Sequence, residues 1–320
     1  MSPRLDWGRD AKGRSAWTRG KALAATAVLT TLLLVFHSLV PNVGPRLGSL
    51  LETFLPWLGV AVLALLVAAV LRRSGAALIA LVAPVTAWLV LFGVMALPDG
   101  DPDGELIAVQ HNVSDENRDP GATARTLMAA EPDFIGVQEL TPQALPVYAE
   151  VFAAAYPHHA LWGSVALWSR HPLTDARPVG IRPASFPPEW NRGLRATATT
   201  PHGEIAVYVA HLPSLRLRPS GFGSAHRDES AALLGAAIAA EPVERVILLG
   251  DLNGTLDDRG LGTLVDLTGR VDSGFAFSWP ASSPVARVDQ VLVRSGTVAN
   301  LRTLPATGSD HLPIVAGIGF

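Results

Sequence analysis

Cysteine is absent from this 320-residue chain, and charged residues make up only 17% of it. The lack of thiols excludes disulfide bonds, a cysteine nucleophile and thiolate metal sites, while it leaves the redox compartment open. Hydrophobic residues make up 49% of the chain and its mean hydropathy is +0.30, which excludes a disordered protein. The 29 glycines and 25 prolines follow no period, so collagen-like and other low-complexity classes are also excluded.

Charge is scarcest in the first third of the chain, where three long apolar runs follow one another. A bilayer core about 30 Å thick needs roughly 20 helical residues, and the runs 22–40, 51–71 and 76–97 are each close to that length. We therefore predict three transmembrane helices within residues 1–98. The first run has the basic flank of a signal peptide, but its length and the lack of a small-residue cleavage site favour a retained helix.

Basic residues are distributed unevenly around these runs. The N-terminal segment has six and the second connection has two, whereas the first connection has one and the segment after the third run has none. Because Lys and Arg accumulate on the cytoplasmic side, we expect a multi-pass protein of the cell membrane with a cytoplasmic N-terminus. Everything after Leu97 would then be extracytoplasmic, beginning with a linker at 99–104 that is rich in Pro, Asp and Gly.

Residues 105–320 have the pattern of a single α/β domain. Short β-rich runs alternate with helical stretches over a length that suffices for one packed core. Polar side chains recur where the apolar strands begin or end, and strand ends can bring distant residues to one rim of an α/β fold. The candidate site residues of this kind are Asn112, Glu139, His211, Asp251, Asn253, Asp289, Asp310 and His311.

Taken one at a time, these residues have simpler explanations. Asn112 and the Gly-Asp-Leu-Asn segment at 250–253 favour turns. Asp289 could pair with a neighbouring arginine, and each histidine could be a satisfied core residue. Their joint occurrence in one order along the chain favours a shared site.

The polar residues belong to six short motifs, which are Gln110-His-Asn112, Val137-Gln-Glu139, Ala210-His-Leu212, Gly250-Asp-Leu-Asn253, Val288-Asp-Gln-Val291 and Ser309-Asp-His311. Their order resembles that of the endonuclease/exonuclease/phosphatase superfamily, which includes DNase I, exonuclease III, inositol polyphosphate 5-phosphatases and neutral sphingomyelinases. The resemblance covers residues 105–320. It implies a four-layer α/β sandwich, in which two mixed sheets pack face to face with helices outside. The three apolar runs ahead of it resemble a bacterial subset of membrane proteins of the VanJ type, linked to teicoplanin resistance.

The resemblance implies phosphate-ester hydrolysis with a bound divalent cation. Glu139 would be the metal-ligating carboxylate, with Asn112 as an amide-oxygen ligand or an orienting group beside it. Asp310 would touch a metal-bound water or support the ligands. Oxygen ligands suit Mg²⁺ or Mn²⁺, and the closely spaced pair His158-His159 reads as surface residues rather than a zinc site.

The other motif residues would perform the chemistry. Asp251 would accept the proton of the attacking water, and Asn253 would donate to a phosphate oxygen. His311 would stabilise the phosphate charge as an imidazolium, kept protonated by Asp289, and His211 would be a second donor. The resemblance leaves open whether Asp251 or His311 is the base.

Charge bears on the substrate. From Asp99 to the C-terminus, 25 acidic residues against 16 arginines give a net charge of −9, which argues against tight binding of nucleic acid without excluding it. A basic stretch at 177–227 is the exception. Within it, Arg216 and Arg218 are the candidate phosphate- or pyrophosphate-binding residues, with a solvated basic loop as the alternative.

We therefore expect a membrane-anchored, extracytoplasmic phosphoesterase. Its partners would be the lipid bilayer and a phosphorylated small-molecule or lipid-linked substrate. Two alternatives stay open: an extracellular Mg²⁺-dependent nuclease, and a non-catalytic membrane protein that binds a phosphorylated ligand. The acidic domain argues against the first, and the full set of site residues argues against the second.

Overall fold

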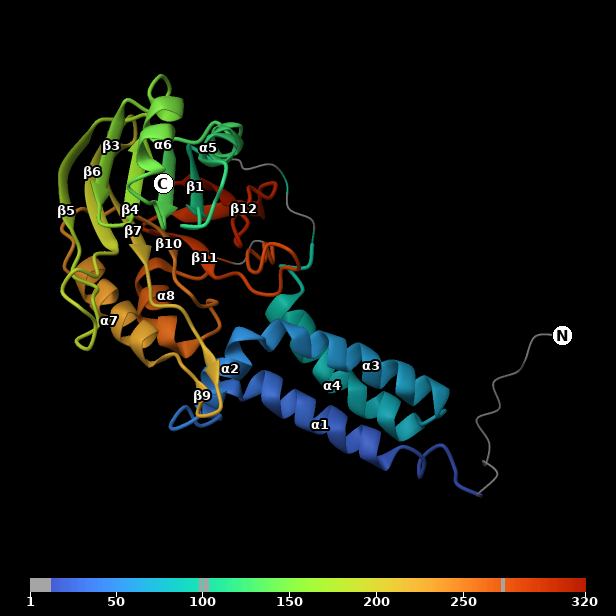
Figure 1. Ribbon diagram of the computed structural model, residues 1–320. Coiled ribbons are helices and arrows are strands. Elements are labelled where there is room, and N and C mark those ends of the chain that lie inside the picture. Colours follow the sequence, from blue (N-terminus) through green and yellow to red (C-terminus); the bar gives the residue numbers. More distant parts are fainter. Residues whose placement is uncertain (1–12, 98–99, 101–103, 272–273) are drawn as a thin grey trace. The chain divides into compact units, whose positions relative to one another are not determined.

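The computed structural model in Figure 1 describes residues 13–97, 100, 104–271 and 274–320. The chain divides into two compact units. The helical unit comprises the chain up to Pro41 together with Phe54–Ala96. The α/β unit comprises Asn42–Thr53 together with Leu97–Phe320.

The helical unit contains three apolar helices, α1 (Lys21–Val35), α3 (Leu58–Leu71) and α4 (Gly75–Phe92). They meet through small residues, because Ala27, Ala69 and Ala77 all belong to one buried cluster. Small side chains allow helix backbones to approach closely in an apolar bundle.

Only the third predicted transmembrane helix has spanning length among the described residues. α4 has 18 residues and is apolar enough to cross a membrane. α1 has 15 residues and gives way to a 3₁₀ turn at His37–Leu39, so it does not extend over the predicted 22–40.

The run predicted as a helix at 51–71 is broken. α2 (Leu47–Thr53) and the segment Leu55–Leu71 meet at a bend of 68°, and at most they form one broken span. Pro56 lies in a 3₁₀ turn (Leu55–Trp57) at this bend, where its ring disfavours a continuous helix. Three full-length spanning helices are therefore not supported.

α2 lies in the α/β unit although the chain places it between α1 and α3. Glu52, which the sequence places near the start of the second apolar run, is buried and forms an ion pair with Arg259 (Oε1–Nη2 2.8 Å). A carboxylate is costly in a lipid environment, so this partner accounts for its presence. The predicted linker at 99–104 falls almost entirely outside the described residues.

The first sheet of the α/β unit has six strands in the described part of the chain. β1 pairs in parallel with β2 and antiparallel with β13. The order is β12 (Thr297–Thr303), β13 (Ile314–Gly319), β1 (Leu106–Asn112), β2 (Phe134–Gln138), β4 (Val165–Ser169), β3 (His158–Trp162).

The second sheet has five strands among the described residues. β10 pairs in parallel with β7 and antiparallel with β11. The order is β11 (Asp289–Arg294), β10 (Val246–Asp251), β7 (Gly203–His211), β6 (Gly193–Thr200), β5 (Leu173–Pro178). A separate small hairpin consists of β8 (Leu217–Arg218) and β9 (Gly221–Phe222).

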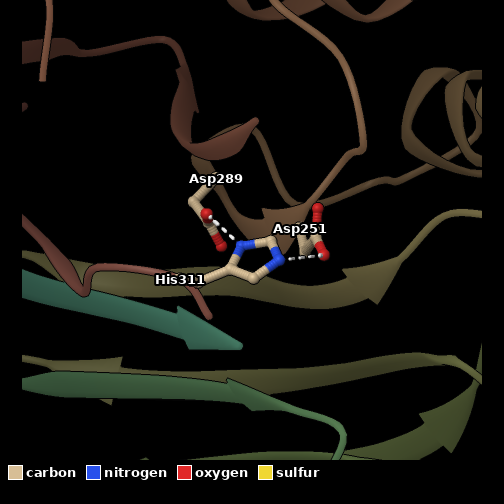
Figure 2. A group of neighbouring side chains, drawn as sticks. All are labelled: Asp251, Asp289 and His311. Carbon is tan, nitrogen blue, oxygen red and sulfur yellow. Dashed lines mark hydrogen bonds and ion pairs between the residues drawn. The ribbon is translucent and has the colours of Figure 1, made fainter. Parts of the chain in front are cut away.

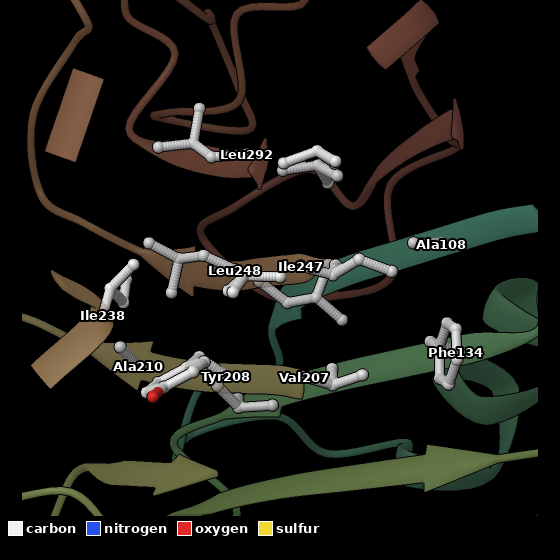
Figure 3. Packing of buried hydrophobic residues seen from close by; sticks show 14 of the residues in the cluster. Ala108, Phe134, Val207, Tyr208, Ala210, Ile238, Ile247, Leu248 and Leu292 are labelled. Atoms are coloured by element: carbon white, nitrogen blue, oxygen red, sulfur yellow. The ribbon is translucent and has the colours of Figure 1, made fainter. Parts of the chain in front are cut away.

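The two sheets pack face to face through apolar side chains (Figure 3). Ala108 and Phe134 of the first sheet lie in the same buried cluster as Val207 and Ile247 of the second. The sheets approach closely at Gly136 of β2, because a Cβ there would lie 2.7 Å from a side-chain atom of Leu249 in β10.

Helices cover the outer faces of both sheets. α5 (Pro120–Met128) and α6 (Leu145–Phe152) bury apolar residues in a second cluster on the outer face of the first sheet. α7 (Ala225–Ala239) and α8 (Gly262–Thr268) pack on the second sheet (Figure 1). The mixed α/β architecture expected from the motifs is therefore present.

Candidate active site

The polar strand ends meet at one edge of the two sheets. In the first sheet, Asn112 at the end of β1 lies beside the end of β2, directly before Glu139. In the second sheet, Asp251 at the end of β10 lies beside His211 of β7 and Asp289 of β11. β11 runs opposite to β10, so its first residue reaches this edge.

His311 lies between two buried carboxylates (Figure 2). Its Nδ1 is 2.7 Å from Asp289 Oδ2, and its Nε2 is 3.8 Å from Asp251 Oδ2. Burial alone would lower the pKa of His311, but the charges of Asp289 and Asp251 and the hydrogen bond to Asp289 raise the pKa to about 10. His311 is therefore an imidazolium at neutral pH.

Asp251 is oriented by two hydrogen bonds. Asn112 Nδ2 donates to Asp251 Oδ2 at 3.0 Å, and the backbone N–H of Asn253 donates to Oδ1 at 3.0 Å. Burial raises the pKa of Asp251 to about 7, although His311 acts in the opposite direction. A fixed carboxyl that titrates near neutral pH is suited to general-base catalysis.

Asp289 keeps its negative charge. Burial would raise the pKa of its carboxyl, but the charge and the hydrogen bond of His311 lower it. Its other oxygen, Oδ1, accepts a hydrogen bond from Gln110 Nε2 at 3.0 Å. The pair of Asp289 and His311 is thus a satisfied buried ion pair, which holds the imidazolium in one orientation.

Both asparagines of the site use their amide groups within the protein. Asn112 Oδ1 accepts from the backbone N–H of Ser114 at 3.0 Å, so its contacts favour the orienting role among the two predicted for it. Asn253 Nδ2 donates to the carbonyl of Leu212 at 2.9 Å. Asn253 and Glu139 have φ angles of 47° and 57°, and such unfavourable backbone conformations gather at functional sites.

His211 joins this cluster to an arginine that the motifs did not indicate. Its Nε2 is 3.5 Å from Asp251 Oδ2 and 3.8 Å from Glu139 Oε1, and Arg192 Nη1 lies 3.0 Å from its Nδ1. Burial, together with the positive charges of Arg192 and His311, holds the pKa of His211 well below its usual value. A neutral His211 can accept the hydrogen bond from Arg192.

Glu139 is the carboxylate best placed to bind a divalent cation. Its side chain is 26% exposed, and no described residue donates a hydrogen bond to it. Asp251, Asp289 and His311 also bring ligand atoms within 4.8 Å of one another, but an imidazolium cannot bind a metal. Asp310 is exposed beside His311, whose pKa its charge helps to raise.

Two buried glutamines were not predicted as part of the site. Gln110 and Gln138 exchange hydrogen bonds of 2.6 and 2.7 Å between β1 and β2, beneath Asp289 and Glu139. Buried amides require partners, so a glutamine inside each of two apolar strands was the available signal. It lay within the quoted motifs but received no role.

Arg216 and Arg218 do not join the catalytic side chains. They lie at the β8–β9 hairpin and line a cavity of about 580 Å³. Arg192 lines the same cavity and contacts His211, so the cavity adjoins the catalytic cluster.

Residues 109–311 match the Endonuclease/Exonuclease/phosphatase family. The chain belongs to this family. No curated protein sequence matches the chain. Family membership makes the strand-edge cluster the candidate site for hydrolysis of a phosphate ester.

Solved structures share the fold of this family member. Sphingomyelinase C from Streptomyces griseocarneus is 19% identical, with a TM-score of 0.51 over 66% of this chain and 98% of that chain. Beta toxin from Staphylococcus aureus with bound magnesium ions is 15% identical, with a TM-score of 0.51 over 66% and 99%. D. rerio TDP2 complexed with a single-strand DNA product is 19% identical, with a TM-score of 0.54 over 68% and 100%.

Proposed function

We propose that this protein is a membrane-anchored, metal-dependent phosphoesterase that hydrolyses a phosphate ester or pyrophosphate on the extracytoplasmic side. The observation that carries the proposal is the buried ion pair of His311 and Asp289, which faces the carboxyl of Asp251 at the strand edge. This arrangement combines a fixed positive charge for a phosphate oxygen with a base for the attacking water.

The protein's own residues divide the work. Asp251 takes the proton of the attacking water, since its raised pKa makes it a stronger base than an ordinary carboxylate. His311 donates a charge-assisted hydrogen bond to the phosphate, and its high pKa argues against a role as the base. Arg192 lies on the other side of His211 and adds positive charge.

Mg²⁺ or Mn²⁺ is the cation that the donor set fits. Glu139 offers a partly exposed carboxylate, and Mg²⁺ requires only one or two such ligands because it keeps several waters. The bound magnesium of the staphylococcal beta toxin, which has the same fold, supports this choice. When bound, the cation would supply further positive charge to the reacting phosphate.

Exposed apolar surface supports anchoring in a membrane. Only 22% of the apolar window of α4 is buried, whereas a core helix of a soluble protein would be mostly covered. Its exposed residues include Val82 and Val90, at 64% and 78%, and α1 and α3 expose further leucines and valines. Contiguous apolar surface of this extent is typical of contact with lipid.

Basic residues at one end of the helical unit support the proposed orientation. Arg19 and Lys21 lie at the start of α1, and Arg72 and Arg73 lie in the turn before α4; Ser74 Oγ in that turn donates to the carbonyl of Arg19 at 2.5 Å. If this end is cytoplasmic, the chain leaves the opposite ends of α1 and α4 on the extracytoplasmic side. The same arrangement underlies a proposed relationship to the VanJ-type membrane proteins.

The full-length protein in detergent micelles with Mg²⁺ tests this function. Phosphate release or ester cleavage is compared on a polyprenyl diphosphate, a phospholipid and duplex DNA at equal concentrations. We expect the lipid-linked phosphate to be cleaved fastest. Faster cleavage of DNA would favour the nuclease alternative, and no cleavage of any ester would favour the non-catalytic one.

A further inference from the structure

The cavity beside the catalytic cluster is strongly basic. Four arginines line it, and no aspartate or glutamate is among the described residues of its wall. The arginines come from three separate segments of the chain and are Arg46, Arg192, Arg216 and Arg218. A concave, uniformly positive surface concentrates anionic ligands.

Three of these arginines have no carboxylate partner. Within the described chain, no carboxylate oxygen lies within 4.0 Å of the guanidinium of Arg192, Arg216 or Arg218. Unneutralised guanidinium groups around a cavity favour bidentate binding of phosphate oxygens.

The fourth arginine is anchored without losing the excess of charge. Arg46 Nη1 contacts Asp228 Oδ2 at 2.6 Å and Ser224 Oγ at 3.1 Å at the start of α7. Asp228 also accepts from Arg227 Nε at 2.8 Å. One carboxylate thus serves two guanidinium groups, and the wall stays positive.

The segment that joins α1 to α3 forms part of this cavity. Gly44 and Arg46 line it, and the backbone N–H of Phe222 donates to the carbonyl of Pro45 at 2.9 Å. Gly221 has a φ of 122°, and a Cβ at this position would clash with the backbone of Pro45. The hairpin therefore fits closely against residues 42–53, which fixes the outer wall.

Aromatic side chains form the remaining wall. The rings of Phe186 and Trp190 are 5.5 Å apart, and those of Phe186 and His226 are 4.9 Å apart. The guanidinium of Arg192 lies 5.3 Å from the ring centre of Trp190. The cavity can therefore hold an anionic group next to the catalytic cluster and an apolar group beside it.

We propose that this cavity binds a second phosphoryl group, and that the substrate is a diphosphate ester of an organic alcohol. The inference rests on the proposed function and deepens it. The terminal phosphoryl group lies at Asp251 and His311. The inner phosphoryl group lies against Arg192, Arg216 and Arg218, and the organic group lies along the aromatic wall.

The reaction that follows is hydrolysis of the phosphoanhydride. The water oxygen forms a bond to the terminal phosphorus, and the bond from that phosphorus to the bridging oxygen breaks. The proton of the water passes to Asp251, and the bridging oxygen leaves with the inner phosphoryl group. The products are orthophosphate and the monophosphate ester, in which the arginines stabilise the charge of the leaving group.

Two probes that differ by one phosphoryl group test this inference. kcat/KM of the full-length protein in detergent is measured with farnesyl diphosphate and with farnesyl phosphate, for wild type and for the double variant R216A/R218A. Charged hydrogen bonds contribute about 1.5–3 kcal/mol each, so the ratio of diphosphate to monophosphate activity is expected to fall about 10-fold or more.

A surface arginine outside the cavity provides the matched control. Arg125 is exposed on α5, and Arg125→Ala is expected to leave both activities unchanged. An equal loss of both activities in the double variant, or no loss of either, would overturn the second phosphate site.

Direct binding separates this inference from the proposed function. Inorganic pyrophosphate and orthophosphate are titrated calorimetrically into the full-length protein without divalent cations. Tighter binding of pyrophosphate that is lost in R216A/R218A supports the cavity even if no ester is hydrolysed. Equal binding of both anions, or binding that the double variant retains, contradicts it.

Discussion

At the scale of single residues, the protonation of the site follows from the order of three side chains. Asp289, His311 and Asp251 alternate negative, positive and negative, and all are buried. The central imidazolium gains from both neighbours, while Asp251 is left with burial as its dominant influence. The site therefore holds a fixed cation and a base that titrates near neutral pH.

This order predicts a bell-shaped pH dependence of kcat/KM. The pKa of Asp251 is raised to about 7, so activity rises as pH increases through that value and the base loses its proton. The pKa of His311 is raised to about 10, so activity falls as pH increases through that value. Initial rates of the Mg²⁺-loaded protein over this range measure both limbs. Activity that declines from pH 6 to 8 would contradict the assignment of Asp251 as the base.

Asp289→Asn tests how the charge of His311 is maintained. Without the adjacent carboxylate, burial dominates and lowers the pKa of His311, so the alkaline limb moves to lower pH. kcat should fall about 10²- to 10⁴-fold, the range typical for loss of a proton-transfer group. Asp266→Asn, an exposed site on α8, is the control. An unchanged alkaline limb in Asp289→Asn would show that another group sets it.

At the scale of elements, α2 is attached to the α/β unit by buried ion pairs. Glu52 Oε2 accepts from Arg259 Nε at 2.8 Å and from the Arg259 backbone N–H at 3.0 Å. Two residues on, Asp258 pairs with the buried Arg227. These contacts fix the segment that also supplies Arg46 to the cavity.

Glu52→Gln should loosen this segment. Hydrogen bonds to a charged group contribute about 1.5–3 kcal/mol, which corresponds to about 10- to 100-fold more frequent opening. Trypsin cleavage at Arg46 in the full-length protein, followed by mass spectrometry, measures this opening. Glu150→Gln on the exposed face of α6 should cleave at the wild-type rate. Equal rates for both variants would mean that other contacts hold α2.

The sequence predicted elements best where one pattern acts over the whole segment. The apolar strands ending in Asn112, His211 and Asp251 formed as expected, because a buried sheet requires continuous apolar runs. The apolar run at 51–71 was misread, because hydropathy cannot distinguish lipid from protein as the partner of a buried face. Glu52 was the clue, since a carboxylate there needed a cation that lay some 200 residues away in the chain.

At the scale of the whole molecule, the motifs predicted which side chains would gather but not how they are shared. Strand order placed the six motifs at one edge of two sheets. The contact of Arg192 with His211, and the cavity wall formed by residues 42–53, depend on packing between distant segments. Such contacts leave no periodic trace in the sequence.

The absence of cysteine makes the proposed orientation directly testable. Single substitutions Thr18→Cys and Ser282→Cys place a thiol at exposed sites on the helical unit and the α/β unit. In intact cells, a membrane-impermeant maleimide should label Ser282→Cys but not Thr18→Cys, and permeabilisation should expose both. Labelling of Thr18→Cys alone in intact cells would reverse the orientation.

Phosphate release by the full-length protein tests the central claim most directly, namely that Glu139 and His311 act in one cation-dependent site. Wild type should release phosphate from a polyprenyl diphosphate with Mg²⁺ and not with EDTA. Glu139→Gln and His311→Ala should each lower the rate about 100-fold or more, while His159→Ala, a surface histidine, should match wild type. Full activity in both site variants would contradict the account.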